Sequence, residues 1–139
     1  MPDQLEEKKR YQFKKEDKLK SRKAIEELFA RGKSFTVFPL RVVWQVADKE
    51  QGLRAGVSAG SRYFKKAVDR NRAKRLMREA YRISRYELAL LLKEKNKGMS
   101  VFFLYQHKEL PEYHALKEKM EAAIKRLINL CHEKPEIHP

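Results

Sequence analysis

Hydrophobic and polar positions follow two different periods along this chain. Apolar residues spaced three and four apart predict amphipathic helices over residues 22–31 and 112–132. Ser21 suits the N-cap of the first helix, and Gly32 suits its C-terminal end. Over residues 40–46 every second residue is apolar, which is typical of a β-strand. The pattern therefore predicts a fold that mixes helices and strands.

The remaining strands follow from apolar runs and turn residues. Residues 48–52, DKEQG, indicate a turn, after which residues 53–59 are expected to return as a hairpin partner of the preceding strand. Residues 99–105, MSVFFLY, are almost wholly apolar, as in a strand covered on both faces. Residues 34–38 are a candidate for one further short strand. The order predicts an α+β fold, an α/β sandwich of helices on a small sheet.

The most basic part of the chain is residues 62–85, which contain ten Lys or Arg and two acids. We expect a helix that begins between residues 65 and 70, continues to about residue 95 and has Gly98 as its stop signal. At about 100° per residue, one face of this helix carries polar side chains: Asn71, Lys74, Arg75, Arg78, Arg82 and Arg85. The opposite face is apolar: Ala73, Leu76, Met77, Ala80 and Ile83. Such a helix would dock on a core and present a row of cations to an anionic partner.

Charge is concentrated in two segments of a chain whose formal net charge is +14. Nine bases and five acids give residues 1–23 a net charge of +4, and ten bases and two acids give residues 62–85 a net charge of +8. We predict a flexible basic N-terminal arm over residues 1–18, a single binding domain over residues 19–132 and a frayed tail over residues 133–139.

The residue types favour binding over catalysis. The single Cys131 fits a reducing compartment, and no apolar run approaches the roughly 20 residues that span a bilayer, so the cytoplasm is the expected location. Neither a zinc-site spacing nor a Gly-rich phosphate loop is present in the sequence. RNA is favoured over DNA or a membrane surface as the anion. Several aromatic residues are candidates for stacking on single-stranded bases: Phe29, Phe35, Phe38, Tyr63 and Phe64.

Residues 65–82, KKAVDRNRAKRLMREAYR, strongly resemble the Arg-Asn-Arg signature of the bacterial ribonuclease P protein family. Residues 19–35 resemble that family's first helix and Gly-Lys-Ser turn, and residues 53–60 resemble its strand before the basic loop. The similarity extends over about residues 18–130. It implies an αβββαβα order with a left-handed βαβ crossover, against the usual right-handed rule.

The resemblance also implies a function. The family's holoenzyme is an endonuclease that removes the 5′ leader of precursor tRNA by metal-dependent hydrolysis, and its catalytic groups lie on the RNA subunit. The protein would bind no cofactor alone, because Mg²⁺ would be held mainly by the RNA. Its partners would be the catalytic RNA and precursor tRNA, with no DNA or membrane, and it would act as a monomer in a 1:1 ribonucleoprotein.

The same resemblance implies roles for individual residues. Contacts to the catalytic RNA are expected from the signature and the basic residues around it: Arg62, Lys65, Lys66, Arg70, Asn71, Arg72, Lys74, Arg75, Arg78 and Arg82. The cleft for the 5′ leader is expected at Ile25, Phe29 and Ser58, and no residue is expected to be catalytic or to bind a metal.

Two other functions remain open from the sequence. The chain could be a general structured-RNA or ribosome-associated binding protein without a role in cleavage. It could also be a protein-only nuclease, which would require a cluster of acids drawn from Asp48, Glu50, Asp69 and Glu79.

Overall fold

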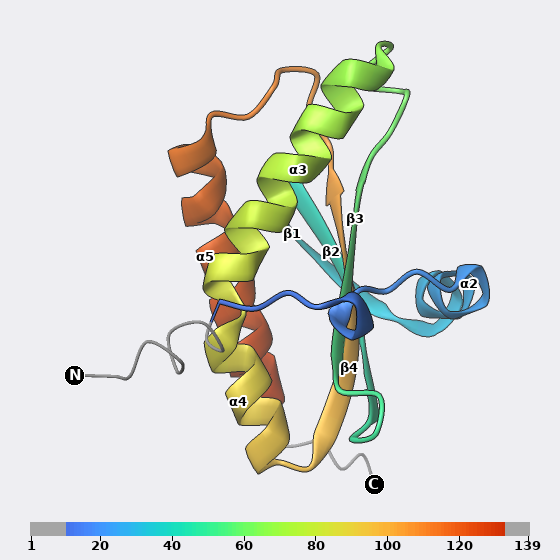
Figure 1. Ribbon diagram of the computed structural model, residues 1–139, viewed down its shortest axis with the longest axis vertical. Coiled ribbons are helices and arrows are strands. Elements are labelled where there is room, and N and C mark those ends of the chain that lie inside the picture. Colours follow the sequence, from blue (N-terminus) through green and yellow to red (C-terminus); the bar gives the residue numbers. More distant parts are fainter. Residues whose placement is uncertain (1–10, 133–139) are drawn as a thin grey trace, which may run out of the picture.

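The computed structural model describes residues 11–132 as helices packed on one mixed sheet (Figure 1). Its elements in chain order are η1 (Lys15–Asp17), α2 (Arg22–Arg31), β1 (Lys33–Val37), β2 (Leu40–Asp48), β3 (Leu53–Ala59), α3 (Ala67–Ser84), α4 (Tyr86–Glu94), β4 (Lys97–Tyr105) and α5 (Tyr113–His132). The predicted α+β class and element order are confirmed, and the candidate strand at residues 34–38 is present as β1.

The pairing of the strands differs from the predicted hairpin. The sheet order is β1-β2-β4-β3, with β4 antiparallel to β2 and parallel to β3. The strand over residues 53–59 therefore does not pair with the strand that precedes it. Central strands are covered on both faces, and β4 has the most continuous apolar run, with Val101, Phe102 and Phe103 all buried. Burial of this strand outweighs the local preference for a hairpin.

Helices cover the two faces of the sheet unequally (Figure 1). Helices α3, α4 and α5 form a layer on one face, and α2 lies on the other face over β2. The path from β3 through α3 and α4 to β4 joins two parallel neighbouring strands, which is the βαβ unit that the resemblance implies. The left-handed sense of this crossover stays a prediction.

The first helix agrees with its sequence signals. The Ala24 N–H donates to Ser21 Oγ at 3.3 Å, which caps α2, and the Gly32 N–H closes the other end on the Leu28 carbonyl. Leu28 is the buried residue of α2, and it packs with Leu19, Val43 and Phe102 in a small core of its own. This second core fixes α2 on the face of the sheet away from α3.

The basic helix is divided at Arg85, whereas the sequence predicted one helix to about residue 95. Arg85 keeps right-handed helical dihedral angles (φ −75°, ψ −20°), so α4 follows α3 end to end. The predicted stop at Gly98 is also wrong, because Asn96 takes the left-handed conformation (φ 55°) and Gly98 lies inside β4. A Cβ on Gly98 would collide with the Asp48 carbonyl oxygen and the Gly52 backbone. Glycine at this position therefore allows β4 to approach the β2–β3 turn closely.

Residues 11–18, which we call the strap, cross from α3 to the edge of β3 (Figure 1). The Leu19 N–H donates to the Ala55 carbonyl at 2.8 Å, and Lys18 forms an isolated parallel bridge with Ala55. The first ten residues of the predicted arm and the predicted tail, residues 133–139, lie outside the part of the chain that the structure describes. The division of the chain at residue 18 stays a prediction.

Candidate nucleic-acid interface

The middle of α3 presents polar side chains outward. Ala73, Met77, Ala80 and Tyr81 are fully buried and dock the helix on the main core. On the outer side Asn71, Arg72, Arg75 and Arg78 are exposed and Lys74 is half-buried. The predicted cation row is therefore formed over residues 71–78 of α3.

The loop before α3 adds exposed charge and one buried aromatic. Arg62, Lys65 and Lys66 are exposed, while Arg70 Nη1 donates to the carbonyls of Phe64 at 2.8 Å and Lys65 at 3.0 Å. Arg70 thus fastens the loop to the helix. Phe64 is 4% exposed and stacks on Tyr105 at 5.8 Å between ring centroids, so its predicted role as a base-stacking residue is wrong.

The other aromatic candidates remain on or near the surface. Phe29 and Phe38 are exposed, and Tyr63 and Phe35 are half-buried. The Arg126 guanidinium lies 5.1 Å from the centroid of the Phe35 ring, on the α5 side of the sheet. Phe35 is therefore used in packing between β1 and α5.

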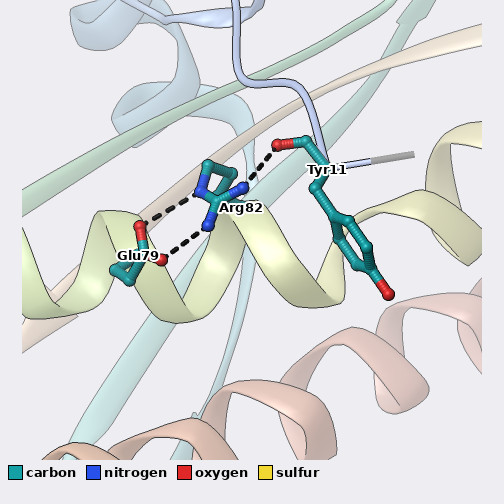
Figure 2. Close-up of polar contacts among 3 residues, drawn as sticks. All are labelled: Tyr11, Glu79 and Arg82. Carbon is teal, nitrogen blue, oxygen red and sulfur yellow. Dashed lines mark hydrogen bonds and ion pairs between the residues drawn. The ribbon is translucent and has the colours of Figure 1, made fainter. Parts of the chain in front are cut away.

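Arg82, one turn beyond residue 78 on α3, contacts the strap instead of facing solvent freely (Figure 2). Arg82 donates from Nε and Nη2 to the Glu79 carboxylate, at 3.1 and 2.6 Å, and from Nη1 to the Tyr11 carbonyl at 3.0 Å. The hydrogen bond from Arg82 holds the pKa of Glu79 below its ordinary value. Arg82 is thus occupied by contacts within the protein.

Arg85, which the helical wheel placed on the exposed row, is buried. Its side chain is 10% exposed, its Nη1 donates to the Gln12 carbonyl at 2.9 Å, and its Nη2 lies 3.7 Å from an oxygen of Asp17. A helical wheel shows only that Arg85 faces away from the core, and it does not show whether solvent or another segment, here the strap, covers that face. The row available to a partner ends at Arg78.

A cleft of about 280 Å³ lies between α2, the strap and the sheet. The side chains and backbone that line it are Phe13, Lys18, Leu19, Lys20, Ile25, Ala55, Gly56, Val57, Arg78 and Phe102. Gly56 lets the Phe102 ring pack directly on the backbone of β3, since a Cβ there would meet that ring at 2.7 Å. Of the three predicted leader residues, Ile25 lines this cleft. Phe29 lies beside it, edge-on to Phe102 at 5.4 Å, and Ser58 is half-buried further along β3.

Sequence reasoning missed the strap's contribution to this cleft. Phe13 and Lys18 line it, although residues 11–18 were predicted to belong to a flexible arm. One signal was available, because Tyr11 and Phe13 are two aromatic residues in an otherwise polar and charged segment. Aromatic rings in such a segment can anchor it on a folded domain, because their burial is strongly favourable.

Two further observations concern metals and membranes. Within residues 11–132 no group of three or more His, Cys, Asp or Glu side chains is placed to hold a metal ion. In the same range, no helix has the length and apolar character needed to cross a lipid bilayer. Of the acids considered for a protein-only nuclease, Asp48 and Glu50 lie at the β2–β3 turn, and Asp69 and Glu79 lie on α3.

A small α+β domain with a helix-borne row of cations beside an apolar cleft has the features of an RNA-binding protein. The family model for ribonuclease P matches residues 13–128. The chain therefore belongs to the ribonuclease P protein family.

Similar sequences and folds agree with this assignment. The ribonuclease P protein component of Porphyromonas gingivalis is 34% identical over 115 residues, covering 81% of this chain and 84% of that protein. The one from Chlorobium phaeobacteroides is 29% identical over 120 residues, covering 78% and 82%. The RNase P protein from Thermotoga maritima has the same fold, with a TM-score of 0.59, 24% identity and coverage of 78% of this chain and 96% of that one. A Staphylococcus aureus RNase P protein mutant gives a TM-score of 0.59 at 16% identity, covering 90% and 94%.

Proposed function

We propose that this chain assists the removal of the 5′ leader from precursor tRNA by binding two RNA segments at once. As a member of the ribonuclease P protein family, the chain is a subunit of an endoribonuclease that matures tRNA 5′ ends, and its partner is the ribonuclease P RNA. The observation that carries the proposal is the exposed cation row of α3, which lies next to the apolar cleft and shares Arg78 with it.

The cation row binds the ribonuclease P RNA. Arg72, Arg75 and Arg78 project from a helix whose opposite face is fixed in the core, so little backbone reorganisation is needed on binding. Guanidinium forks match phosphate oxygens and also stack on exposed bases. The exposed Arg62, Lys65 and Lys66 extend this surface beyond the N-terminal end of α3.

The cleft binds the single-stranded leader. Its walls combine apolar groups, such as Ile25 and Phe102, with the cations Lys18, Lys20 and Arg78. Single strands are recognised by such surfaces, since bases pack on the apolar groups while phosphates contact the cations. Phe29, exposed at the edge of the cleft, extends the apolar surface.

The ribonuclease P RNA supplies the catalytic groups for hydrolysis, and its phosphates hold the Mg²⁺ ions. Mg²⁺ prefers carboxylate, phosphate and water oxygens, whereas the exposed surface of α3 is cationic and Glu79 is paired with Arg82. The protein contributes by neutralising phosphates near the catalytic centre and by orienting the leader. We further propose that one copy of the chain assembles with one RNA in the cytoplasm, without DNA or membrane partners.

The test is a reconstitution of leader cleavage at low Mg²⁺ with precursor tRNA and the ribonuclease P RNA of the same organism. We expect no cleavage by the protein alone, and a large acceleration when the protein is added to the RNA. Arg75→Ala should require more protein for the same rate, whereas Lys119→Ala, the same charge loss on the exposed side of α5, should behave as wild type.

An unchanged cleavage rate on addition of the protein would contradict the proposal. A protein that binds leadered and mature tRNA equally, both alone and with the RNA, would instead be the general RNA-binding protein considered above. Membership of the ribonuclease P family argues against that alternative.

A further inference from the structure

The strap is held on α3 by two arginines that lie three residues apart. Arg82 and Arg85 each donate from Nη1 to one of two successive strap carbonyls, those of Tyr11 and Gln12, at 3.0 and 2.9 Å. Glu79 holds the Arg82 guanidinium in place through two hydrogen bonds (Figure 2). Both arginines therefore hold the strap backbone through charge-assisted hydrogen bonds, and Arg85, whose side chain is 10% exposed, is withdrawn from phosphate binding.

Apolar contacts and the other end of the strap complete the attachment. The Phe13 ring packs edge-on against the fully buried Tyr81 at 5.1 Å between centroids. The Lys14 N–H donates to Asp17 Oδ2 at 2.9 Å, which folds the strap into the turn η1 before it reaches β3. Because both ends are fixed, the strap backbone holds Phe13 and Lys18 at defined places on the surface.

Those two side chains stand between two hollows of the surface. Phe13, Lys18 and Arg78 line the cleft described above and also line a second hollow of about 440 Å³. The rest of that hollow is formed by α3 through Arg75, Leu76, Glu79 and Arg82. A strand that runs from the cleft to the cation row therefore crosses Phe13, Lys18 and Arg78.

The chemistry of this crossing suits a single-stranded nucleotide. Lys18 Nζ lies 5.7 Å from the centroid of the Phe13 ring, and Arg78 belongs to the exposed row, so an aromatic ring and two cations converge. We propose that Phe13 and Lys18 contact the leader between the cleft and the cation row, and that Arg82 and Arg85 are positioning residues that hold the strap for this contact. The inference rests on the proposed function, since it assigns residues to the binding of the leader.

The first experiment compares Lys18→Ala with Lys15→Ala in the reconstituted holoenzyme. Both variants remove one positive charge from the strap, but Lys15 is exposed and lines neither hollow. The readout is the ratio of the Kd for mature tRNA to the Kd for precursor tRNA with a short leader. We expect Lys18→Ala to lower this ratio about fivefold, the scale of one charged contact, and Lys15→Ala to leave it within about twofold.

The second experiment tests the positioning role of Arg82 with a double-mutant cycle. Arg82→Ala should lower the same ratio and speed tryptic cleavage after Lys14 and Lys15, because the strap is released. Lys18→Ala added to Arg82→Ala should then have little further effect, since the strap no longer presents Lys18. Arg82→Lys, which can reach only one of the two partners, should recover part of the wild-type ratio.

The outcomes distinguish a failure of the proposed function from a failure of the strap contact alone. If the wild-type holoenzyme does not prefer the leadered tRNA, the proposed function fails and the inference fails with it. If the wild type shows the preference but Lys18→Ala and Lys15→Ala behave alike, the strap contact alone is refuted. Additive effects of Arg82→Ala and Lys18→Ala would overturn the positioning role.

Discussion

Tyr81 is the residue at which the strap, α3 and the sheet meet. Its ring is fully buried, with Phe13 of the strap at 5.1 Å and Phe103 of β4 at 5.4 Å between centroids. Burial raises the pKa of its phenol to about 12, and the neighbouring Arg85 charge only partly opposes this. The phenol finds no hydrogen-bond acceptor within the described part of the chain.

This environment predicts a loss of stability in alkali. The folded-state pKa of about 12 exceeds the ordinary value of 10.0, so the stabilisation is intact below pH 10 and is lost as the pH rises towards 12. The free energy of unfolding should fall by about 1.4 kcal/mol per pH unit in that window from this group. Denaturant titrations at successive pH values measure the effect.

Tyr81→Phe is the control for this prediction. It should be at least as stable as the wild type at neutral pH, because the buried hydroxyl has no hydrogen-bond partner among residues 11–132. Its stability should decline less steeply above pH 10, with a residual decline from Tyr105, whose pKa is raised by burial and then by the Glu109 charge. Equal slopes for the two proteins would show that Tyr81 does not control the alkaline transition.

Among the elements, β4 determines the sheet, and its position depends on Gly98. This residue lies where β4 passes the β2–β3 turn, and its α-carbon faces the backbones of Asp48 and Gly52. Backbone atoms cannot rotate away as the end of a long side chain can. Any side chain at this position must therefore displace this end of β4 from the β2–β3 turn.

We predict that Gly98→Ala destabilises the protein by about 1–3 kcal/mol, the usual cost of overpacking. Gly60→Ala is the matched control, since a Cβ there would have its nearest neighbour, the Arg62 nitrogen, at 3.9 Å. That variant should stay within about 0.5 kcal/mol of the wild type. Thermal or urea unfolding of the three proteins measures the difference, and equal stabilities would disprove the steric role of Gly98.

The bounds of most elements could be predicted from the sequence, but the pairing of the strands could not. The helix predicted at residues 22–31 and the strand predicted at 53–59 coincide with α2 and β3, because caps and periodicity are local signals. Pairing depends on which strand is buried most fully, and that is decided by the helices covering both faces. A preference for short connections therefore gave the wrong neighbour for β3.

In the candidate site too, local features could be predicted from the sequence and tertiary contacts could not. The exposed residues of the cation row could be predicted because an amphipathic helix fixes their common face. The inward position of Arg85 and the contribution of Phe13 could not, since both depend on a strap about 70 residues away in the sequence, at the scale of tertiary packing. The family resemblance predicted Ile25 at the cleft, but it did not predict that the strap residues Phe13 and Lys18 also line it.

At the scale of the whole molecule, the positive charge is placed to attract RNA to one surface. The net charge is +14, and residues 62–85 supply +8 of it through ten bases and two acids. Several of those bases are used internally, because Arg70, Arg82 and Arg85 each bond to backbone carbonyls. The number of phosphates neutralised should therefore be smaller than the charge suggests.

This arrangement predicts a measurable salt dependence of RNA binding. The affinity for the ribonuclease P RNA should fall linearly on a log–log plot against salt concentration, because counterions are released on binding. Arg75→Ala should make the slope shallower by about one unit, as expected for one lost phosphate contact, and Lys119→Ala should leave it unchanged. A slope that is the same for Arg75→Ala and the wild type would place Arg75 outside the phosphate contacts.

The insertion of β4 between β2 and β3 has a consequence for how the protein is made. The sheet neighbour of β3 is β4, so a chain growing from its N-terminus carries β3, which ends at residue 59, and the basic α3, which ends at residue 84, before β4 is complete at residue 105. Only the β1–β2 hairpin can pair early, and closure of the sheet waits for contacts distant in sequence, which slows folding. The floor of the cleft needs Phe102 of β4, and α3 docks on α5 as well as on β3. Both proposed RNA-binding surfaces therefore form together, late in synthesis, and a chain that stops before residue 97 is expected to form neither.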